Sequence, residues 1–247
     1  MSSDLLSSLR LDSNTPNKIF TVKEINNCDS SFIVSSFLSH WIKNKNAVLI
    51  VSTHNSLRHY QLVGLKMNYN LQRCIDAGIV IFYNLGDNAV SSLMRNEQNV
   101  LKNHFTKIKE KIQKLQETYS DVNIVFDGIS HLFDLNFSLS DVNNFCNNVI
   151  KLSRCLENSC VLFHCNMSNE DDVTYLMANL LSHKANTTLE VENLPSGLSA
   201  DVSGHLVIKY PGMKFQDDHM FALEYRSAKF LFKLFDRGVK LFAPGTV

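Results

Sequence analysis

The residues with the clearest chemical potential form a polar turn near the N-terminus, between a short predicted strand and a predicted amphipathic helix. In nucleotide-binding α/β proteins this turn holds phosphate. Glycines let backbone N–H groups surround the anion, while a Lys and a Ser or Thr contact the phosphates and magnesium. Here residues 23–31 contain no glycine and no Gly-Lys pair, and the carboxylates of Glu24 and Asp29 would repel phosphate. The sequence therefore predicts a degenerate P-loop at Asp29, Ser30 and Ser31, without a bound cofactor.

A second candidate carboxylate is Asp127, which directly follows the apolar run Ile124-Val125-Phe126. An apolar strand ending in Asp is the Walker-B pattern, which holds magnesium in ATPases. The pattern is also common in ordinary buried strands. Without a phosphate-binding lysine the carboxylate has no nucleotide site to complete. We therefore expect Asp127 to cap the following loop and not to bind Mg-ATP.

A divergent ATPase or kinase is the alternative that this region leaves open. It would need a replacement for the missing lysine, and Lys23 is the nearest, although it precedes the turn instead of opening the helix. It would also need an acid to orient the attacking water. Asp87 is the only acid in the corresponding region, residues 83–87, and its Gly-Asp-Asn context favours a turn. We expect no enzymatic activity.

Other catalytic and metal-binding patterns are missing as well. The sequence has no GxSxG motif. The six cysteines form no CxxC pair, and Cys160 and His164, which share a strand face, are too few for a zinc site. We expect reduced, buried structural thiols. The histidines are scattered singly, which is more typical of surface or core positions than of bases or ligands; they are His40, His54, His59, His104, His131, His164, His183, His205 and His219.

The elements that would position these residues follow from hydrophobic periodicity. We expect buried strands at residues 19–22, 47–51, 79–82, 124–126 and 160–163. Helices are expected from the N-terminal turn to residue 45, from a cap at residues 52–56 to residue 66, and at residues 97–119, 138–158 and 171–184. Alternating strands are expected at residues 187–191, 206–210, 220–225 and 230–235, with a hairpin turn at residues 226–229.

Four β–α units followed by an antiparallel tail predict an α/β fold: a mostly parallel sheet flanked by helices, extended by C-terminal antiparallel strands. This layout is typical of the RecA-like, P-loop NTPase-type core. In the first helix, Val34, Phe37, Leu38 and Trp41 share one face, which we expect to be buried. The pattern of residues 97–119 could form a coiled coil, but its short length favours a helix packed on the sheet.

Length and composition favour one domain at residues 17–247, preceded by a flexible arm at residues 1–16. Lys and Arg total 24, as do Asp and Glu, so the net charge does not indicate a stand-alone RNA-binding module. The lysines at positions 107, 111 and 114 form a stripe that we read as solvated instead of RNA-binding. No secretory signal or membrane span is evident, so a cytoplasmic or nuclear location is expected.

Three segments resemble the family formed by the sixth subunit of the Elongator complex. They are residues 29–38 (DSSFIVSSFL), 59–66 (HYQLVGLK) and 194–206 (LPSGLSADVSGHL). The resemblance extends over nearly the whole chain from about Ile19, in the same order and spacing. No single motif is diagnostic, because this family lacks a catalytic signature. The specific feature is the series of segments together with the vacant P-loop.

The resemblance implies a RecA-like fold without Walker motifs and a structural role. The fourth and fifth Elongator subunits would join this one in a hetero-hexameric ring with two copies of each. Through the ring, the complex would bind tRNA and support wobble-uridine modification. By fold analogy, loops carrying Ser130, His131, Asn166 and Asn169 would face the ring centre. The segment between Asn193 and Leu206 is short and lacks a basic residue, which argues against RNA contact there.

Overall fold

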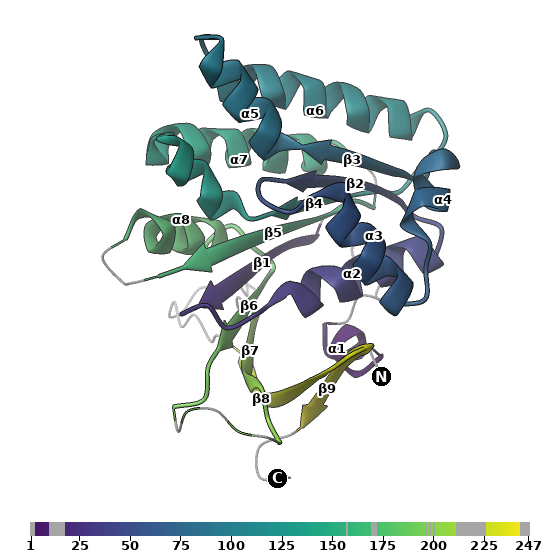
Figure 1. Cartoon of the computed structure of the whole chain (residues 1–247), viewed down its shortest axis with the longest axis vertical. Coiled ribbons are helices and arrows are strands. Elements are labelled where there is room, and N and C mark those ends of the chain that lie inside the picture. The colour runs from purple at the N-terminus through teal and green to yellow at the C-terminus, as the bar shows by residue number, and fades with distance from the viewer. Residues whose placement is uncertain are drawn as a thin grey trace, which may run out of the picture.

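The computed structural model describes residues 3–9, 18–156, 158–168, 172–195, 197, 199, 201–210 and 226–242. These residues form a nine-stranded sheet in the order β3-β2-β4-β5-β1-β6-β7-β8-β9 (Figure 1). Strands from β3 to β6 pair in parallel, whereas β6 to β9 pair antiparallel. The chain is therefore an α/β protein with a mostly parallel sheet and an antiparallel C-terminal extension.

The strands are β1 (Lys18–Ile25), β2 (Ala47–Ser52), β3 (Val80–Asn84), β4 (Val122–Asp127), β5 (Cys160–Met167), β6 (Thr187–Glu192), β7 (Gly204–Tyr210), β8 (Arg226–Phe235) and β9 (Gly238–Phe242). The helices are α1 (Ser3–Ser8), α2 (Ser31–Lys43), α3 (Leu57–Lys66), α4 (Leu71–Asp76), α5 (Leu85–Met94), α6 (Val100–Gln116), the 3₁₀ helix η1 (Ile129–Leu135), α7 (Leu139–Arg154) and α8 (Val173–Ser182).

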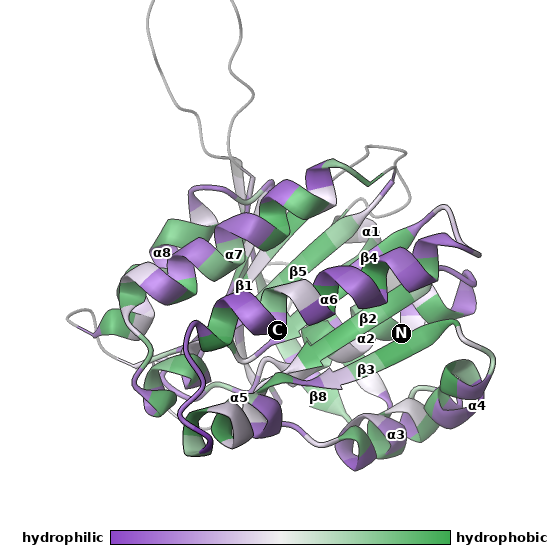
Figure 2. Cartoon of the chain, turned by 90° about the horizontal axis from the view of Figure 1, so that it is seen from above, coloured by the Kyte–Doolittle hydropathy of each residue, from purple (hydrophilic) through white to green (hydrophobic). Residues whose placement is uncertain are grey.

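The sheet separates two hydrophobic cores. One core lies under α6, α7, α8 and η1, and the other lies under α2, α3 and α4 and continues beneath the antiparallel strands. All residues of β2 and of β4 are buried, as expected for strands that are covered on both faces. Figure 2 shows the matching pattern of hydropathy, with apolar central strands and polar outer faces on α6 and α7.

Helix phases agree with the predicted stripes. Val34, Phe37, Leu38 and Trp41 are buried on α2. On α6, Leu101, Ile108 and Ile112 belong to the hydrophobic core against the sheet, so this helix packs on the sheet, as predicted in preference to a coiled coil. Lys107 and Lys114 are exposed on the outer side of α6, and Lys111 lies over the ring of Tyr83.

Several elements and residues differ from the predictions. Residues 226–229 are not a turn but the start of β8; the turn is at Asp236 and Arg237, before Gly238 with φ +148°. Gly tolerates that backbone conformation, which no residue at 226–229 favours. Asp87 does not form a turn either, because it lies in the first turn of α5, where the side chain of Asn84 accepts its N–H. The strand predicted at residues 220–225 lies outside the described residues.

Two further findings concern side chains. The predicted arm contains helix α1, which the sequence did not indicate, and Leu5 and Leu9 of this segment are buried. The expectation of buried thiols is wrong in part. All six cysteines are free, but only Cys28, Cys146 and Cys165 are buried, and Cys155 is exposed. Among the described residues, no helix is both long enough and apolar enough to cross a lipid bilayer.

A close backbone contact at Gly86 leads to a stability prediction. A Cβ atom at this position of α5 would lie 2.0 Å from the carbonyl oxygen of Thr53. Gly86→Ala is expected to lower the free energy of unfolding by about 2–3 kcal/mol, because backbone must move to relieve the overlap. Gly78→Ala is the control, since its φ is +73° but nothing lies within 4 Å. That variant measures the conformational penalty alone, about 1 kcal/mol. If urea denaturation shows the same loss of unfolding free energy for Gly86→Ala and Gly78→Ala, the steric explanation is contradicted.

Candidate functional site

A network of buried polar side chains lies at the carboxyl ends of β1, β4 and β5, on the sheet face covered by α2 and α3. This edge of a parallel sheet is where α/β proteins commonly place ligands. Val22 of β1 pairs with His164 of β5, and Phe126 of β4 pairs with Phe163. The register therefore brings the two ends of the network, Glu24 and Asp127, to either side of His164.

Glu24 occupies the N-terminus of α2. Its Oε2 accepts the backbone N–H of Ser30 at 2.9 Å and the Ser30 hydroxyl at 2.8 Å. Its Oε1 accepts the side-chain amide of Asn166 at 2.8 Å. The first N–H groups of a helix have no partner within the helix and attract anions. The anion at this helix terminus is thus a carboxylate of the chain itself.

His164 joins the two carboxylates. Its Nδ1 lies 2.7 Å from Oδ1 of Asp127, and its Nε2 lies 2.7 Å from the Ser30 hydroxyl and 3.7 Å from Oε2 of Glu24. The Nδ1 contact is an ion pair, without the alignment of a good hydrogen bond. Oδ2 of Asp127 accepts hydrogen bonds from the Tyr60 hydroxyl and from the Asn55 amide. The carboxylate of Asp127 is therefore fixed by α3 and β5 and does not cap the following loop.

Electrostatics favour the charged forms of His164, Glu24 and Asp127. Burial on its own lowers the pKa of His164, but the interactions of the imidazole with the carboxylates of Asp127 and Glu24 outweigh it and raise this pKa to about 9. Burial raises the pKa of Glu24, yet His164 and Ser30 bring it down to about 2. The pKa of Asp127 is likewise well below its usual range, because His164 and Tyr60 overcome the effect of burial. The centre of the network is an imidazolium between two carboxylates.

The distances resemble those of a Ser-His-Asp triad, but the chemistry differs. A nucleophilic serine needs a neutral histidine that accepts its proton. Here the Ser30 hydroxyl donates its hydrogen bond to the carboxylate of Glu24, so it has no proton directed at the histidine. The raised pKa of His164 keeps both of its ring nitrogens protonated. The side chain of Ser30 is also fully buried. The arrangement neutralises and immobilises charge and does not activate a nucleophile.

The other predicted site residues have varied positions. Lys23 points to the opposite sheet face, where its Nζ contacts Asn179 of α8 at 2.8 Å and Glu190 at 3.3 Å. Its pKa is lowered, mainly by burial. Asp29 is exposed and accepts the N–H of Ser31, and Ser30 takes the predicted N-cap position of α2.

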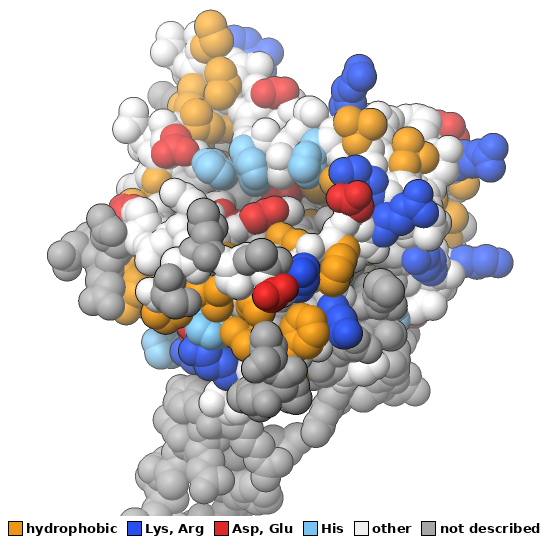
Figure 3. Space-filling model, turned by 60° about the horizontal axis from the view of Figure 1, so that its bottom comes forward, with side chains coloured by type: hydrophobic (Ala, Val, Ile, Leu, Met, Phe, Trp, Pro, Cys, Tyr) orange, Lys and Arg blue, Asp and Glu red, His pale blue; other side chains and the backbone are white. Residues whose placement is uncertain are grey.

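Of the loop residues proposed to face a ring centre, two belong to the network. Ser130 is buried and its hydroxyl accepts the N–H of Asn166, which in turn contacts Glu24. His131 is half-buried, with its ring 4.4 Å from that of His54. Figure 3 shows histidine side chains gathered on one face of the molecule. Asn169 lies outside the described residues.

Sequence reasoning missed Glu24, Tyr60, Asn55 and His164 as partners of one site. His164 carried a usable signal, because it lies near the end of the buried run of β5, in phase with Leu162, which faces the α2 core. Such a residue lies next to the end of a neighbouring parallel strand, here β4. Within the described ranges, no group of three or more His, Cys, Asp or Glu side chains is arranged to hold a metal ion.

The raised pKa of His164 predicts a loss of stability at alkaline pH. Its unfolded-state pKa is 6.5 and its folded-state pKa about 9, so the imidazolium stabilises the fold fully below pH 6.5. The free energy of unfolding is expected to fall by up to about 3 kcal/mol as the pH rises from 6.5 through 9. Urea denaturation across this range measures it. His164→Gln should remove this slope, whereas a control at the exposed His183, His183→Gln, should retain it. A flat wild-type profile would mean that His164 is neutral.

Comparison with known proteins shows the family of this chain. The family model described as Elongation complex protein 6 matches residues 3–234. "Elongator complex protein 6" of Drosophila melanogaster is 25% identical over 233 residues, covering 92% of this chain and 90% of that protein. The proteins of the same name from Rattus norvegicus and Homo sapiens are each 25% identical over 239 residues, covering 88% of this chain and 87% of theirs.

The fold and the site together define an α/β protein whose carboxyl-edge site is filled by the protein's own charged side chains. Within that class, the chain belongs to the Elongation complex protein 6 family.

Proposed function

We propose that this chain is a non-catalytic structural subunit of the Elongator complex with a RecA-like fold and a degenerate P-loop. The observation that carries the absence of catalysis is the network around His164. Where a P-loop would bind phosphate at a helix N-terminus, Glu24 already accepts the N–H of Ser30. Where a Walker-B acid would hold magnesium, Asp127 is already neutralised by an imidazolium. Mg-ATP would have to displace both interactions.

In this proposal the chain assembles with the fourth and fifth Elongator subunits into a hetero-hexameric ring with two copies of each. The ring binds tRNA and supports wobble-uridine modification, in the cytoplasm and also in the nucleus. Family membership across residues 3–234 supports assembly within Elongator. The candidate ring-centre residues that remain are His131 and Asn169, because Ser130 and Asn166 contribute to the buried network.

Co-expression with the fourth and fifth subunits, followed by light-scattering mass measurement, tests the assembly. A stoichiometric species of six chains is the expected result. A species of 28.1 kDa that elutes apart from both partners would reject it.

The alternative function, a divergent ATPase or kinase, depends on Lys23 as the phosphate ligand. The ion pair of Lys23 with Glu190, on the sheet face away from α2, disfavours it. Calorimetric titration with Mg-ATP is expected to show no binding. Binding that Lys23→Ala abolishes would instead establish the alternative.

A further inference from the structure

Helix α3 carries large apolar side chains on the side that faces away from the core. Tyr60 and Gly64, one turn apart, are its buried residues. Leu62 and Leu65 are also nearly one turn apart but are 53% and 60% exposed. Single exposed leucines are ordinary, whereas a pair with helical spacing forms a continuous apolar stripe.

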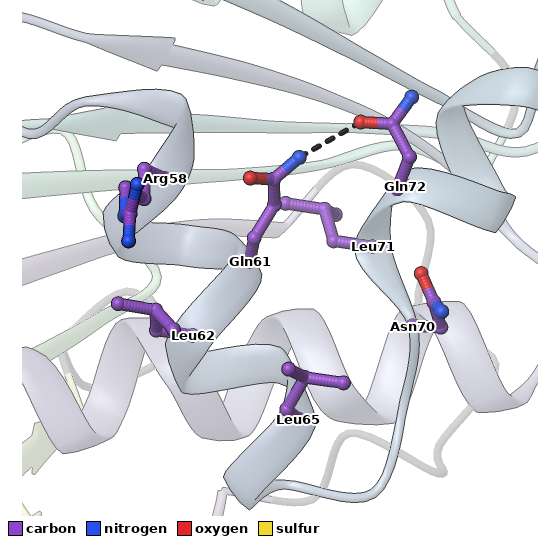
Figure 4. Close-up of a pocket in the computed structure, with 7 residues that line it drawn as sticks. All are labelled: Arg58, Gln61, Leu62, Leu65, Asn70, Leu71 and Gln72. Carbon is purple, nitrogen blue, oxygen red and sulfur yellow. Dashed lines mark hydrogen bonds between the residues drawn. The ribbon is translucent and has the colours of Figure 1, made fainter.

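This stripe borders a formed groove. A cavity of about 370 Å³ lies between α3 and α4, with Leu62 and Leu65 on one side and the buried Leu71 beneath (Figure 4). The amide of Gln61 donates to Oε1 of Gln72 at 2.7 Å, which ties the two helices together across the groove. The two helices that form the groove are thus linked by a side-chain hydrogen bond.

The surroundings of the groove carry positive charge. Arg58 lines it, and Lys66 and Arg73 are exposed on the same two helices. In the part of the chain that the structure describes, no carboxylate lies within ion-pair distance of these three side chains. Asp76 is the one acid of α3 and α4, and its carboxylate accepts a hydrogen bond from Gln72.

We propose that the groove between α3 and α4 is a docking site for a neighbouring protein subunit. The bound segment would insert apolar side chains spaced one helical turn apart, with flanking carboxylates that pair with Arg58 and its basic neighbours. Helices bind grooves in this manner through anchors at i and i+3 or i+4. A protein partner fits better than RNA, because the lining combines three leucines with amide side chains and Arg58 and offers no aromatic ring on which a base could stack. The inference rests on the proposed function, since the occupant is one of the co-assembling Elongator subunits.

The test uses the full chain co-expressed with the fourth and fifth Elongator subunits. The double variant Leu62→Glu/Leu65→Glu keeps good helix formers but places carboxylates on the stripe. Leu176→Glu is the matched control, because Leu176 on α8 is similarly exposed, at 49%, but lies outside the groove. The double variant is expected to weaken association with the partner subunits at least about 10-fold, at an unchanged unfolding temperature, while the control associates like wild type. Arg58→Glu should also weaken it, more strongly at low salt.

Each other outcome overturns the inference in a distinguishable way. Assembly of the double variant with wild-type affinity rejects the groove but leaves the proposed function intact. Equal loss in the double variant and in Leu176→Glu shows a general effect of added charge. Intact assembly with a loss of tRNA binding assigns the groove to RNA. Failure of the wild-type chain to assemble rejects the proposed function, and the docking site with it.

Discussion

Replacing His164 with Leu is expected to lower the free energy of unfolding by about 3–5 kcal/mol. The imidazolium lies between Asp127 and Glu24, and all three side chains are buried or nearly so. Leucine fills a similar volume but leaves two carboxylates without a counter-charge. Removing one partner of a buried ion pair costs far more than the pair contributes when intact, because the remaining charge stays desolvated. Denaturation in urea at pH 6.5 measures the loss.

A second buried histidine supplies the control. His104 is 1% exposed, and its Nδ1 lies 2.6 Å from the hydroxyl of Tyr83, but no carboxylate of the described residues forms an ion pair with it. Burial lowers its pKa. His104→Leu therefore removes neutral hydrogen bonds and is expected to cost about 1–3 kcal/mol. Equal losses in the two variants would show that charge pairing at His164 is unimportant. A second check is the double variant His164→Leu/Asp127→Asn, which should lose less stability than the sum of its single changes.

Trp41→Ala is expected to destabilise the protein by about 3–5 kcal/mol. Trp41 is 4% exposed and meets Phe37 edge-to-face with ring centroids 5.2 Å apart, and Phe37 packs in the same manner on Phe20 of β1 at 4.9 Å. Truncation opens a cavity in the layer that joins α2 to the sheet. The exposed Lys43 on the same helix is the control, and Lys43→Ala should change stability by less than about 0.5 kcal/mol.

Because Trp41 is the single tryptophan, its emission reports the same site in the wild-type protein. A blue-shifted native spectrum is expected from a buried indole. If Trp41→Ala lowers the free energy of unfolding by less than about 1 kcal/mol, the Trp41 side chain lies outside the core and α2 buries a different face.

Much of the parallel half of the fold follows from the sequence, because β2, β3, β4 and β5 contain continuous apolar runs and α2, α6 and α7 have clear stripes. Helix α5 is not among the predicted helices, and β6, expected in the antiparallel tail, pairs in parallel with β1. The C-terminal half follows less well. The turn expected at residues 226–229 is strand, since β pairing overrides weak local preference, and β9 was not recognised at all. Helices α1 and α4 have only six residues each, too few for a periodic signal.

The candidate site shows the same limit for a different reason. The sequence analysis singled out Ser30 and Asp127, but it treated Glu24 as a repulsive charge and His164 as one scattered histidine. Their roles arise from sheet register, which sets β1 and β4 on either side of β5. Local sequence patterns cannot predict which strand lies between two others, so a network assembled across three strands becomes visible only in the fold.

The central place of β1 in the sheet bears on how the protein is made. Among the strands that the structure describes, β1 is synthesised before the others, but its two neighbours are β5 and β6, which end at Met167 and Glu192. Pairings between segments so distant in the chain form slowly, because a long loop must close before they contribute energy. While the ribosome is still translating α7, β1 therefore has neither partner. We expect the apolar residues of β1 and α2 to be accessible to chaperones until β6 has emerged, and truncations before that strand to yield aggregating fragments.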